Sequence, residues 1–241
     1  MLLELDGPAS DMRALQAWRS TSPELCALWD ESVPVSEWAG VVIGVDGADV
    51  GRVLELSLPL KKLTGIVPAE IGRLTALRTL YLNQNQLTSV PPELGRLTKL
   101  TSLVLFFNQL TSVPAELGNL TALQILTLSS NQLTSIPAEL GNLAALQTLD
   151  LSNNQLRSIP AEFGQLTNLT SFRLVNNRVS SLPAELGALT SLLGLEFSGN
   201  PLSFGALPDE VKSLSTENGG NTTFKTNMSY LPGILYYLLF W

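Results

Sequence analysis

Leucines recur at fixed spacing along most of the chain, with polar residues between them. In one unit, LTSLVLFFNQL, leucines stand at Leu100, Leu103, Leu105 and Leu110, which is 8, 5 and 3 residues before Asn108 and 2 residues after it. Two leucines that flank one variable residue have the period of a strand with one buried face. The pattern therefore predicts a short strand in every unit, buried on its leucine side.

The asparagine of this unit also recurs. It occupies six positions, each 23 residues from the last: Asn85, Asn108, Asn131, Asn154, Asn177 and Asn200. A fixed period in this range indicates a solenoid. We interpret these asparagines as structural, because an amide side chain can bond backbone groups at the bend where the chain leaves the sheet.

The second half of each unit predicts a short helical or 3₁₀ turn. In the segment PAELG, Pro114 suits the first helical position and Gly118 suits the residue past the end. Seven stacked coils of this kind bury the leucines in one continuous core. We therefore predict one elongated domain, a right-handed α/β solenoid with a parallel concave sheet about 30 Å long, from six steps of about 4.8 Å.

Residues 53–214 resemble the leucine-rich repeat family, with the motif LxxLxLxxNxL followed by xxxPxxLGxL. Most units are similar to those of the plant intracellular Ras-group-related repeat proteins. The first unit differs, because Leu63–Pro68 (LTGIVP) follows the LxGxxP form of plant extracellular receptors. The resemblance implies the horseshoe fold and a binding role.

Residues 1–52 resemble the N-terminal cap of those receptors. The matching positions are Ala14, Leu15, Trp18, Trp38, Gly40, Val41 and the segment 51–56 (GRVLEL). Receptor caps carry a cysteine two residues after the valine, where this chain has Ile43.

We therefore expect the cap to be held by packing around Trp18, Trp29 and Trp38. Cys26 is expected to be buried in a cap helix from Pro23 to Trp29. After the seven repeats, residues 215–241 are predicted to form a polar linker and an apolar C-terminal tail.

Composition excludes most catalytic chemistry. The chain has no histidine and one cysteine, so a Ser-His-Asp centre, a Cys-His centre, a histidine metal site and an internal disulfide are all excluded. We expect no enzyme activity, no cofactor and no metal. The net charge of −7 disfavours nucleic acid as a partner, since that binding depends on clustered lysine and arginine.

The two ends of the sequence bear on localisation. Glu4 and Asp6 interrupt any signal-peptide apolar region, and the apolar segment LPGILYYLLFW is shorter than the roughly 20 residues of a membrane-spanning helix. Ile234–Trp241 is expected to cover the open leucine face, with membrane association as the alternative. These features favour a cytoplasmic monomer without a transmembrane span. Four glycosylation sequons leave an extracellular location open: Asn119, Asn168, Asn221 and Asn227.

One coil carries aromatic residues where its neighbours carry polar ones. Phe106 and Phe107 replace the serine or asparagine of later units and are predicted to face solvent beside Val104 and, one coil away, Tyr81. Grouped exposed aromatics are expected anchors for a protein partner. The alternative is that the two rings lie flat against neighbouring coils and shield the sheet.

Two columns of charge follow the stack. Asp150, Arg173 and Glu196 are predicted to alternate on three adjacent strands, either pairing with one another or forming a polar rim that adds selectivity for the partner. A second column of carboxylates lies in the first turn after each proline, where it favours the positive helix end. Its members are Glu70, Glu93, Glu116, Glu139, Glu162, Glu185 and Glu210.

A threonine column suggests a further function. Thr88, Thr111 and Thr134, each followed by serine, are predicted to stack in register, and a flat threonine array could bind ice or a polymer. Because Arg157 interrupts the array, the sequence ranks this function below protein recognition.

The sequence thus predicts a noncatalytic module that binds a protein partner on its concave face, in signalling or scaffolding. The partner-binding residues are predicted to be Tyr81, Val104, Phe106, Phe107, Asp150, Arg173 and Glu196. The alternative is the ligand-recognition ectodomain, or a fragment of one, of a plant-type receptor.

Overall fold

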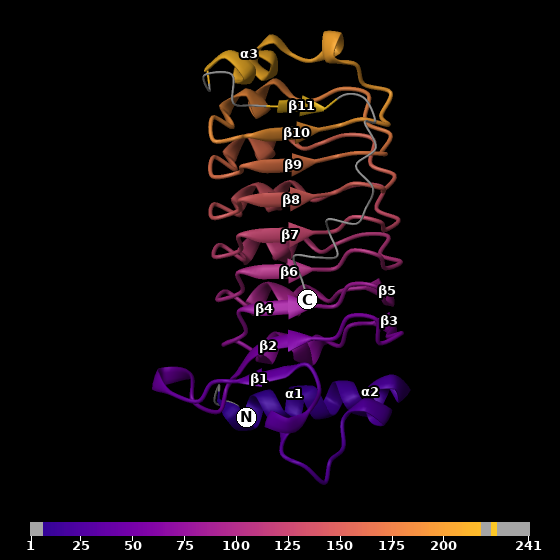
Figure 1. Ribbon diagram of the computed structural model, residues 1–241, viewed down its shortest axis with the longest axis vertical. Helices are drawn as coiled ribbons and strands as arrows, with labels where there is room; N and C mark the ends of the chain where they lie inside the picture. Colours follow the sequence, from indigo (N-terminus) through magenta and orange to yellow (C-terminus); the bar gives the residue numbers. More distant parts are fainter. Residues whose placement is uncertain (1–6, 218–222, 226–241) are drawn as a thin grey trace.

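One nine-stranded sheet organises the part of the chain that the structure, a computed structural model, describes: residues 7–217 and 223–225. Its strands are β1 (Val41–Ile43), β2 (Val53–Ser57), β4 (Thr79–Tyr81), β6 (Ser102–Val104), β7 (Ile125–Thr127), β8 (Thr148–Asp150), β9 (Ser171–Arg173), β10 (Gly194–Glu196) and β11 (Thr223–Lys225). Adjacent strands from β2 to β11 pair in parallel, and β1 pairs antiparallel with β2. The predicted solenoid with a parallel sheet is confirmed (Figure 1).

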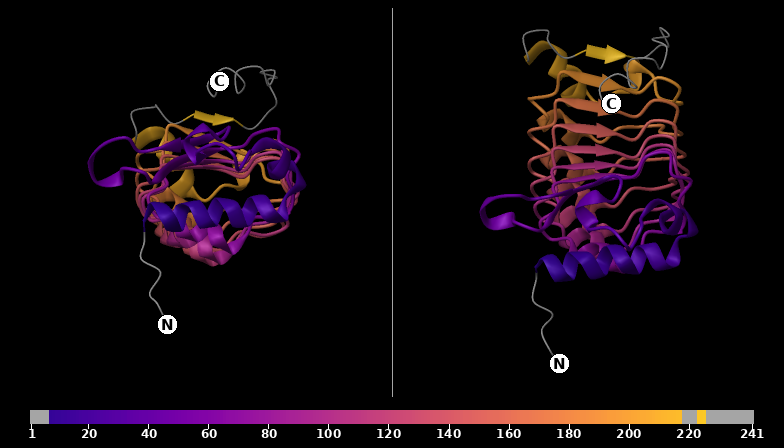
Figure 2. Two further views of the ribbon diagram at one scale, coloured as in Figure 1. Left: turned by 90° about the horizontal axis from the view of Figure 1, so that it is seen from below. Right: turned by 60° about the horizontal axis from the view of Figure 1, so that its bottom comes forward.

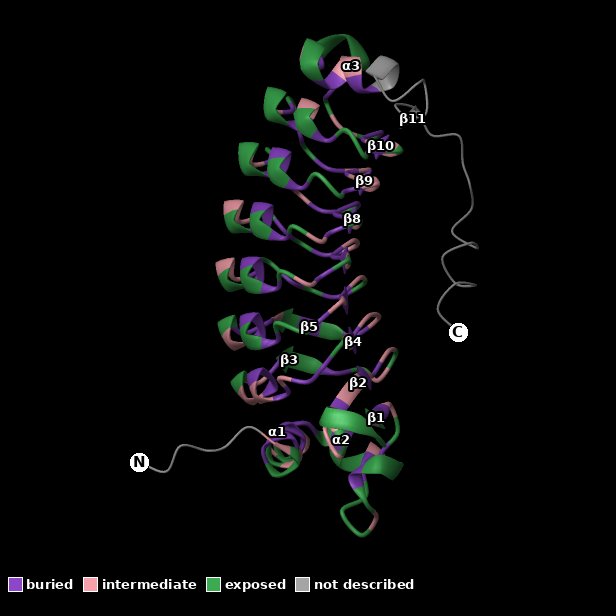
Figure 3. Ribbon diagram, turned by 90° about the vertical axis from the view of Figure 1, so that its left-hand side faces the viewer, coloured by how far each residue is buried: buried purple, intermediate pink, exposed green. Residues whose placement is uncertain are grey.

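Each coil returns through a 3₁₀ helix on the side opposite the sheet. These helices are η3 (Ala69–Arg73), η4 (Pro92–Arg96), η5 (Ala115–Asn119), η6 (Ala138–Asn142), η7 (Ala161–Gln165) and η8 (Ala184–Ala188). Figure 3 shows the stack bowed, with the strands along its inner side and exposed residues on the outer side of the 3₁₀ helices. Six of the seven glutamates of the predicted column lie in the first turns of these helices, and Glu210 lies in the first turn of α3 (Asp209–Glu217), as predicted.

The predicted placement of the proline and the glycine in this turn was wrong. Pro114 is the N-cap of η5, one position before the helix, and Gly118 lies inside η5, not after its end. The reason is the close approach of the next coil. A Cβ atom on Gly118 would lie 2.2 Å from the carbonyl oxygen of Glu139, so this glycine makes room for a neighbouring backbone.

Each of the six asparagines bonds at least three backbone groups, which confirms the structural role that the sequence predicted. Asn108 donates from Nδ2 to the carbonyl oxygens of Leu82 (3.0 Å) and Leu105 (3.1 Å), and its Oδ1 accepts from the Leu87 N–H (3.0 Å). The same pattern recurs at Asn131. Each amide bonds the backbone of two successive coils, so the asparagine column links the coils next to the core of buried leucines.

The N-terminal cap closes one end of the stack. It contains α1 (Pro8–Thr21), α2 (Pro23–Leu28), η1 (Val35–Glu37), β1 and η2 (Gly47–Asp49). Figure 2 shows α1 lying across the end of the coils. Trp18, Trp29 and Trp38 are buried, and the rings of Trp29 and Trp38 stack with centroids 4.9 Å apart.

The cap is therefore held by packing, as predicted. The expectation for Cys26 was wrong, because its side chain is exposed. The residue sits on the outer face of a six-residue helix whose buried position is Leu25.

Two smaller features complete the described fold. On one flank, β3 (Thr64–Ile66) and β5 (Gln86–Ser89) form a two-stranded parallel sheet. At the C-terminal end, η9 (Phe204–Ala206) and α3 (Asp209–Glu217) follow the last coil. The tail predicted to cover the leucine face lies outside the described residues.

Candidate functional site

The inner face of the sheet carries the side chains that the sequence singled out. The parallel register places Tyr81 opposite Val104, Val104 opposite Thr127, and Asp150 opposite Arg173. The next pair in the same column is Arg173 and Glu196. The structure thus brings the predicted residues into one column along the sheet, with Phe106 and Phe107 directly after β6.

Phe106 and Phe107 form an edge-to-face pair, with ring centroids 5.7 Å apart and an angle of 69° between the planes. Their backbone is fixed on both sides. The Gln84 N–H donates to the carbonyl oxygen of Phe106 (2.9 Å), and the Phe107 N–H donates to that of Ser129 (3.0 Å). The Phe107 side chain is 51% exposed, whereas Phe106 is half-buried. We call Tyr81, Phe106 and Phe107 the aromatic patch.

Phe107 occupies a backbone position that disfavours its side chain. In the six coils that carry the asparagine, the residue before it has a left-handed conformation: Gln84 (φ 57°), Phe107 (51°), Ser130 (54°), Asn153 (54°), Asn176 (54°) and Gly199 (70°). In the first coil Leu60, which precedes Lys61, has the same conformation (58°). Glycine and asparagine tolerate this region, but other residues lose roughly 1–2 kcal/mol there. The first three coils therefore keep larger side chains at a strained position.

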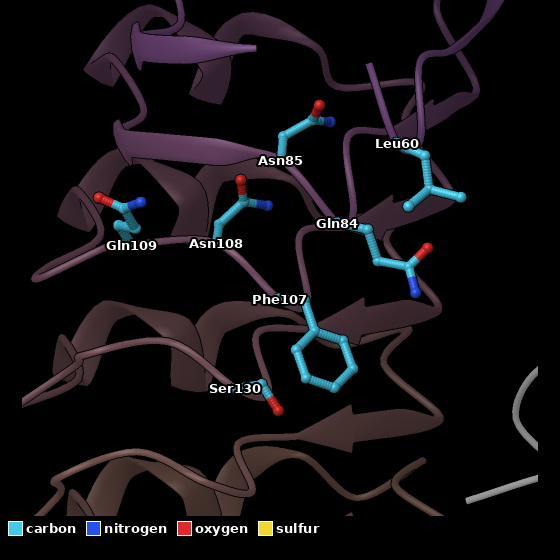
Figure 4. A pocket seen from close by; sticks show the side chains of 7 residues that line it. All are labelled: Leu60, Gln84, Asn85, Phe107, Asn108, Gln109 and Ser130. Atoms are coloured by element: carbon cyan, nitrogen blue, oxygen red, sulfur yellow. The ribbon is translucent and has the colours of Figure 1, made fainter. Parts of the chain in front are cut away.

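A groove of about 430 Å³ lies along this column. It is lined by Leu60, Gln84, Asn85, Phe107, Asn108, Gln109 and Ser130. Figure 4 shows Leu60, Gln84 and Phe107 following one another on successive coils. Leu60, which is 60% exposed, was not among the predicted binding residues. Its signal in the sequence was an apolar side chain in the same slot as Phe107.

Two predicted site residues are not accessible. Val104 is 3% exposed and Asp150 is 4% exposed. Both face away from the leucine core, but short side chains on strands about 4.8 Å apart are shielded by longer neighbours. Asp150 also folds back on its own strand, where its Oδ1 accepts from the Ser152 N–H at 2.9 Å. We therefore correct the expectation that both residues face solvent.

The remaining charged residues do pair. Arg173 Nε lies 3.6 Å from Glu196 Oε1, and both side chains are partly exposed. The sequence predicted either that these charges pair with one another or that they form a polar rim for the partner. The ion pair is confirmed for Arg173 and Glu196. Exposed pairs of this kind contribute at most about 1 kcal/mol.

Within residues 7–217 and 223–225, the structure shows no group of three or more acidic, cysteine or histidine side chains that could hold a metal ion. No helix in the same ranges is long and apolar enough to cross a membrane. What the described site offers is a preformed surface of aromatic rings, amides and aliphatic groups.

The fold and this surface define a repeat solenoid with a rigid, partly apolar inner wall. Sequence profiles agree: the leucine-rich repeat region family matches residues 115–215, and a profile of two leucine-rich repeats matches residues 75–119. The chain belongs to the leucine-rich repeat family. Members of this family are typically noncatalytic binding modules.

Relatives come from plant receptors. The chain is 36% identical over 85 residues to the LRR receptor-like serine/threonine-protein kinase EFR of Arabidopsis thaliana, a match that covers 33% of this chain and 8% of that protein. Among solved structures, it is similar to the ectodomain of the Arabidopsis thaliana receptor kinase SOBIR1 (31% identity, 74% of this chain and 99% of that chain, TM-score 0.61).

The fold also resembles a plant ice-binding protein, with 28% identity over 82% of this chain and 66% of that chain and a TM-score of 0.71. The match to the receptor kinase EFR, in contrast, covers less than a tenth of the length of that protein.

Proposed function

We propose that this chain is a noncatalytic recognition module that binds a protein partner through the aromatic patch on its concave face. The observation that carries the proposal is Phe107, a half-exposed aromatic ring held at a left-handed position where the later coils have serine, asparagine or glycine. A half-exposed aromatic residue kept at a strained backbone position is expected to serve the surface.

Two further observations support this function. The backbone that presents the patch is hydrogen-bonded to the coils on both sides, so a partner can bind with little loss of conformational freedom. Similarity to the SOBIR1 ectodomain supports recognition of the receptor-ectodomain type, which is the alternative setting for the same surface. Arg173 and Glu196 would contribute selectivity at the far end of the column.

Phe107→Asn tests the proposal. Asparagine occupies the same backbone position at Asn153 and Asn176, so the melting temperature should stay within about 2 °C of wild type or rise. Loss of a central aromatic anchor should weaken partner binding by about 30-fold, equivalent to about 2 kcal/mol. The measurement is thermal melting, together with titration of proteins that the immobilised wild-type chain retains from an extract.

The matched control is Asn153→Ser, which changes the same backbone position two coils away and outside the groove. It should leave binding unchanged. If Phe107→Asn lowers the melting temperature while the retained proteins and their affinities stay the same, the rings shield the sheet and the proposed binding function is wrong.

Ice binding is a second candidate function. The similarity to a plant ice-binding protein favours it. Thr88 lies in β5, Thr111 and Thr134 occupy the same position in the next two units, and all three are exposed. Adjacent coils repeat these hydroxyls at about 4.8 Å. The Thr88 hydroxyl already donates to the Gly65 carbonyl oxygen (3.1 Å), and Arg157 ends the array.

If this threonine array binds ice, the wild-type chain should inhibit ice recrystallisation, and Thr111→Lys with Thr134→Lys should abolish the effect. Phe107→Asn should not change it, because the patch lies on another face. Recrystallisation at the buffer rate in the presence of the wild-type chain would exclude this function.

A further inference from the structure

We propose that the groove between Leu60 and Phe107 takes an extended acidic segment of the partner, with an apolar anchor against Phe107. This inference rests on the proposed function and specifies the chemistry of the partner. It follows from the distribution of charge around the groove and from the residues that line it.

Positive charge is concentrated in the coils that form the groove. Residues 52–99 hold seven of the 14 basic residues of the chain and three of its 21 acidic residues, a net charge of +4. The rest of the chain holds seven basic and 18 acidic residues, a net charge of −11. Asp11 and Asp49 of the cap pair with Arg52, Arg78 and Lys99 of these coils. With these two carboxylates included, seven basic and five acidic residues leave a net charge of +2. The first coils are therefore a basic band on an acidic protein, and such a band attracts acidic partners.

Two cations of this band are available next to the groove. Lys61 and Lys62 directly follow Leu60, Lys62 is exposed, and neither forms an ion pair with any residue in the described ranges. By contrast, Arg78 (2.8 Å) and Lys99 (3.1 Å) both bind Asp49. Hydrogen bonds from Arg78 and then Lys99 hold the pKa of Asp49 below its usual range, so that carboxylate stays charged beside them.

The lining of the groove sets the rest of the specificity. Leu60 and Phe107 are apolar, the other lining side chains are four amides and the hydroxyl of Ser130, and none of the seven lining residues is acidic. Leu60 and Phe107 lie two coils apart, about 10 Å, which is the span of about three extended residues. A bound segment would place its apolar anchor at Phe107 and an acidic residue about three positions away, near Lys61 and Lys62.

Charge distinguishes an acidic partner segment from two other possible occupants of the groove, which are residues 226–241 of the same chain and a second copy of the chain. Residues 226–241 contain no charged side chain, so they would leave both lysines unpaired. A second copy offers its acidic 3₁₀ helices, but these present glutamates without an exposed aromatic or leucine anchor among them. An acidic segment with an apolar anchor can contact Phe107 through its anchor and pair its carboxylates with Lys61 and Lys62.

The test uses a phage library of random 12-residue peptides selected on the full chain. Peptides retained by wild type but not by Phe107→Asn should be enriched in Asp and Glu about three positions from a Leu, Phe or Tyr. Their dissociation constants should rise about tenfold with Lys61→Glu and Lys62→Glu together. The matched control, Arg157→Glu with Arg178→Glu, makes the same change in net charge on exposed residues away from the groove and should leave binding unchanged.

The outcomes separate this inference from the proposed function. A Phe107-dependent pool without acidic enrichment, or one that is insensitive to the lysine substitutions, overturns the inference and leaves the recognition function intact. No Phe107-dependent pool at all overturns both. Phe107-dependent self-association in sedimentation experiments, or peptide binding that appears only after residues 226–241 are removed, assigns the groove to a second copy or to the tail and also overturns the inference.

Discussion

Replacing Gly118 with alanine is expected to destabilise the protein, although alanine is the better helix former. Intrinsic propensity alone predicts a gain of about 1 kcal/mol. The structure reverses the sign, because the new Cβ would lie 2.2 Å from the Glu139 carbonyl oxygen and 3.0 Å from the Glu139 Cβ. Since the first of these neighbours is backbone, the two coils must separate. We expect a loss of about 3 kcal/mol, the upper end for overpacking.

The measurement is thermal or urea unfolding of the full chain, and the expected fall in melting temperature is about 10 °C. Gly194→Ala is the matched control, because a Cβ there meets nothing within 4 Å. It should leave stability unchanged or raise it slightly. A Gly118→Ala variant that melts with wild type would show that neighbouring coils are not in backbone contact along the 3₁₀ helices.

The same contact recurs from coil to coil. A Cβ on Gly95 would lie 2.2 Å from the Glu116 carbonyl oxygen, and one on Gly164 would lie 2.3 Å from that of Glu185. The glycine of each unit therefore sets how closely the 3₁₀ helices stack. Because the strands keep their own spacing of about 4.8 Å, the stacking of the outer side contributes to the curvature that makes the sheet face concave.

The second large effect is expected at Asp11, which joins the cap to the first coil. Its carboxylate is 1% exposed and accepts from Arg52 Nε (3.0 Å), Arg52 Nη2 (3.1 Å) and the Val53 N–H (2.8 Å). Arg52 Nη2 also donates to Thr75 Oγ1 (2.9 Å). One buried carboxylate thus connects α1, the start of β2 and the first turn of the stack.

Asp11→Ala should cost about 3–5 kcal/mol, because it leaves the Arg52 guanidinium partly buried without its counter-ion and a buried backbone N–H without an acceptor. Unfolding of the full chain measures the loss. Glu31→Gln is the matched control, because the Arg19–Glu31 pair is shorter (2.6 Å, against 3.0 Å for Arg52–Asp11) but Glu31 is 61% exposed. Its loss should cost less than about 1 kcal/mol. Equal effects of the two substitutions would contradict a structural role for the buried pair.

Asp11 also shows what sequence reasoning missed. Trp18, Trp29 and Trp38 could be predicted as the core of the cap, because large aromatic residues in a segment without a disulfide have few other functions. The partner of Arg52 could not be predicted, since it lies 41 residues earlier on a helix. Only the folded cap brings α1 against β2.

The candidate site likewise has features that the sequence predicted and features that it could not predict. The period of the repeat was sufficient to predict that Tyr81, Phe106 and Phe107 lie near one another and that Asp150, Arg173 and Glu196 share a column. It could not predict that Val104 and Asp150 are buried, because the exposure of a short side chain depends on the length of its neighbours. The repeat places Leu60 in the same column as Phe107, but it could not predict that the two residues line one groove.

The sequence was sufficient to predict the solenoid, its parallel sheet, the asparagine column and the aromatic interruption in one coil. A strict 23-residue period lets one unit define every other, so local pattern is enough. Three-dimensional contacts were needed to show how closely the coils stack at their glycines, which outward side chains are accessible, and that Phe107 is held in a left-handed conformation. These properties depend on distances between coils, and residues that share one sequence pattern can differ in all of them.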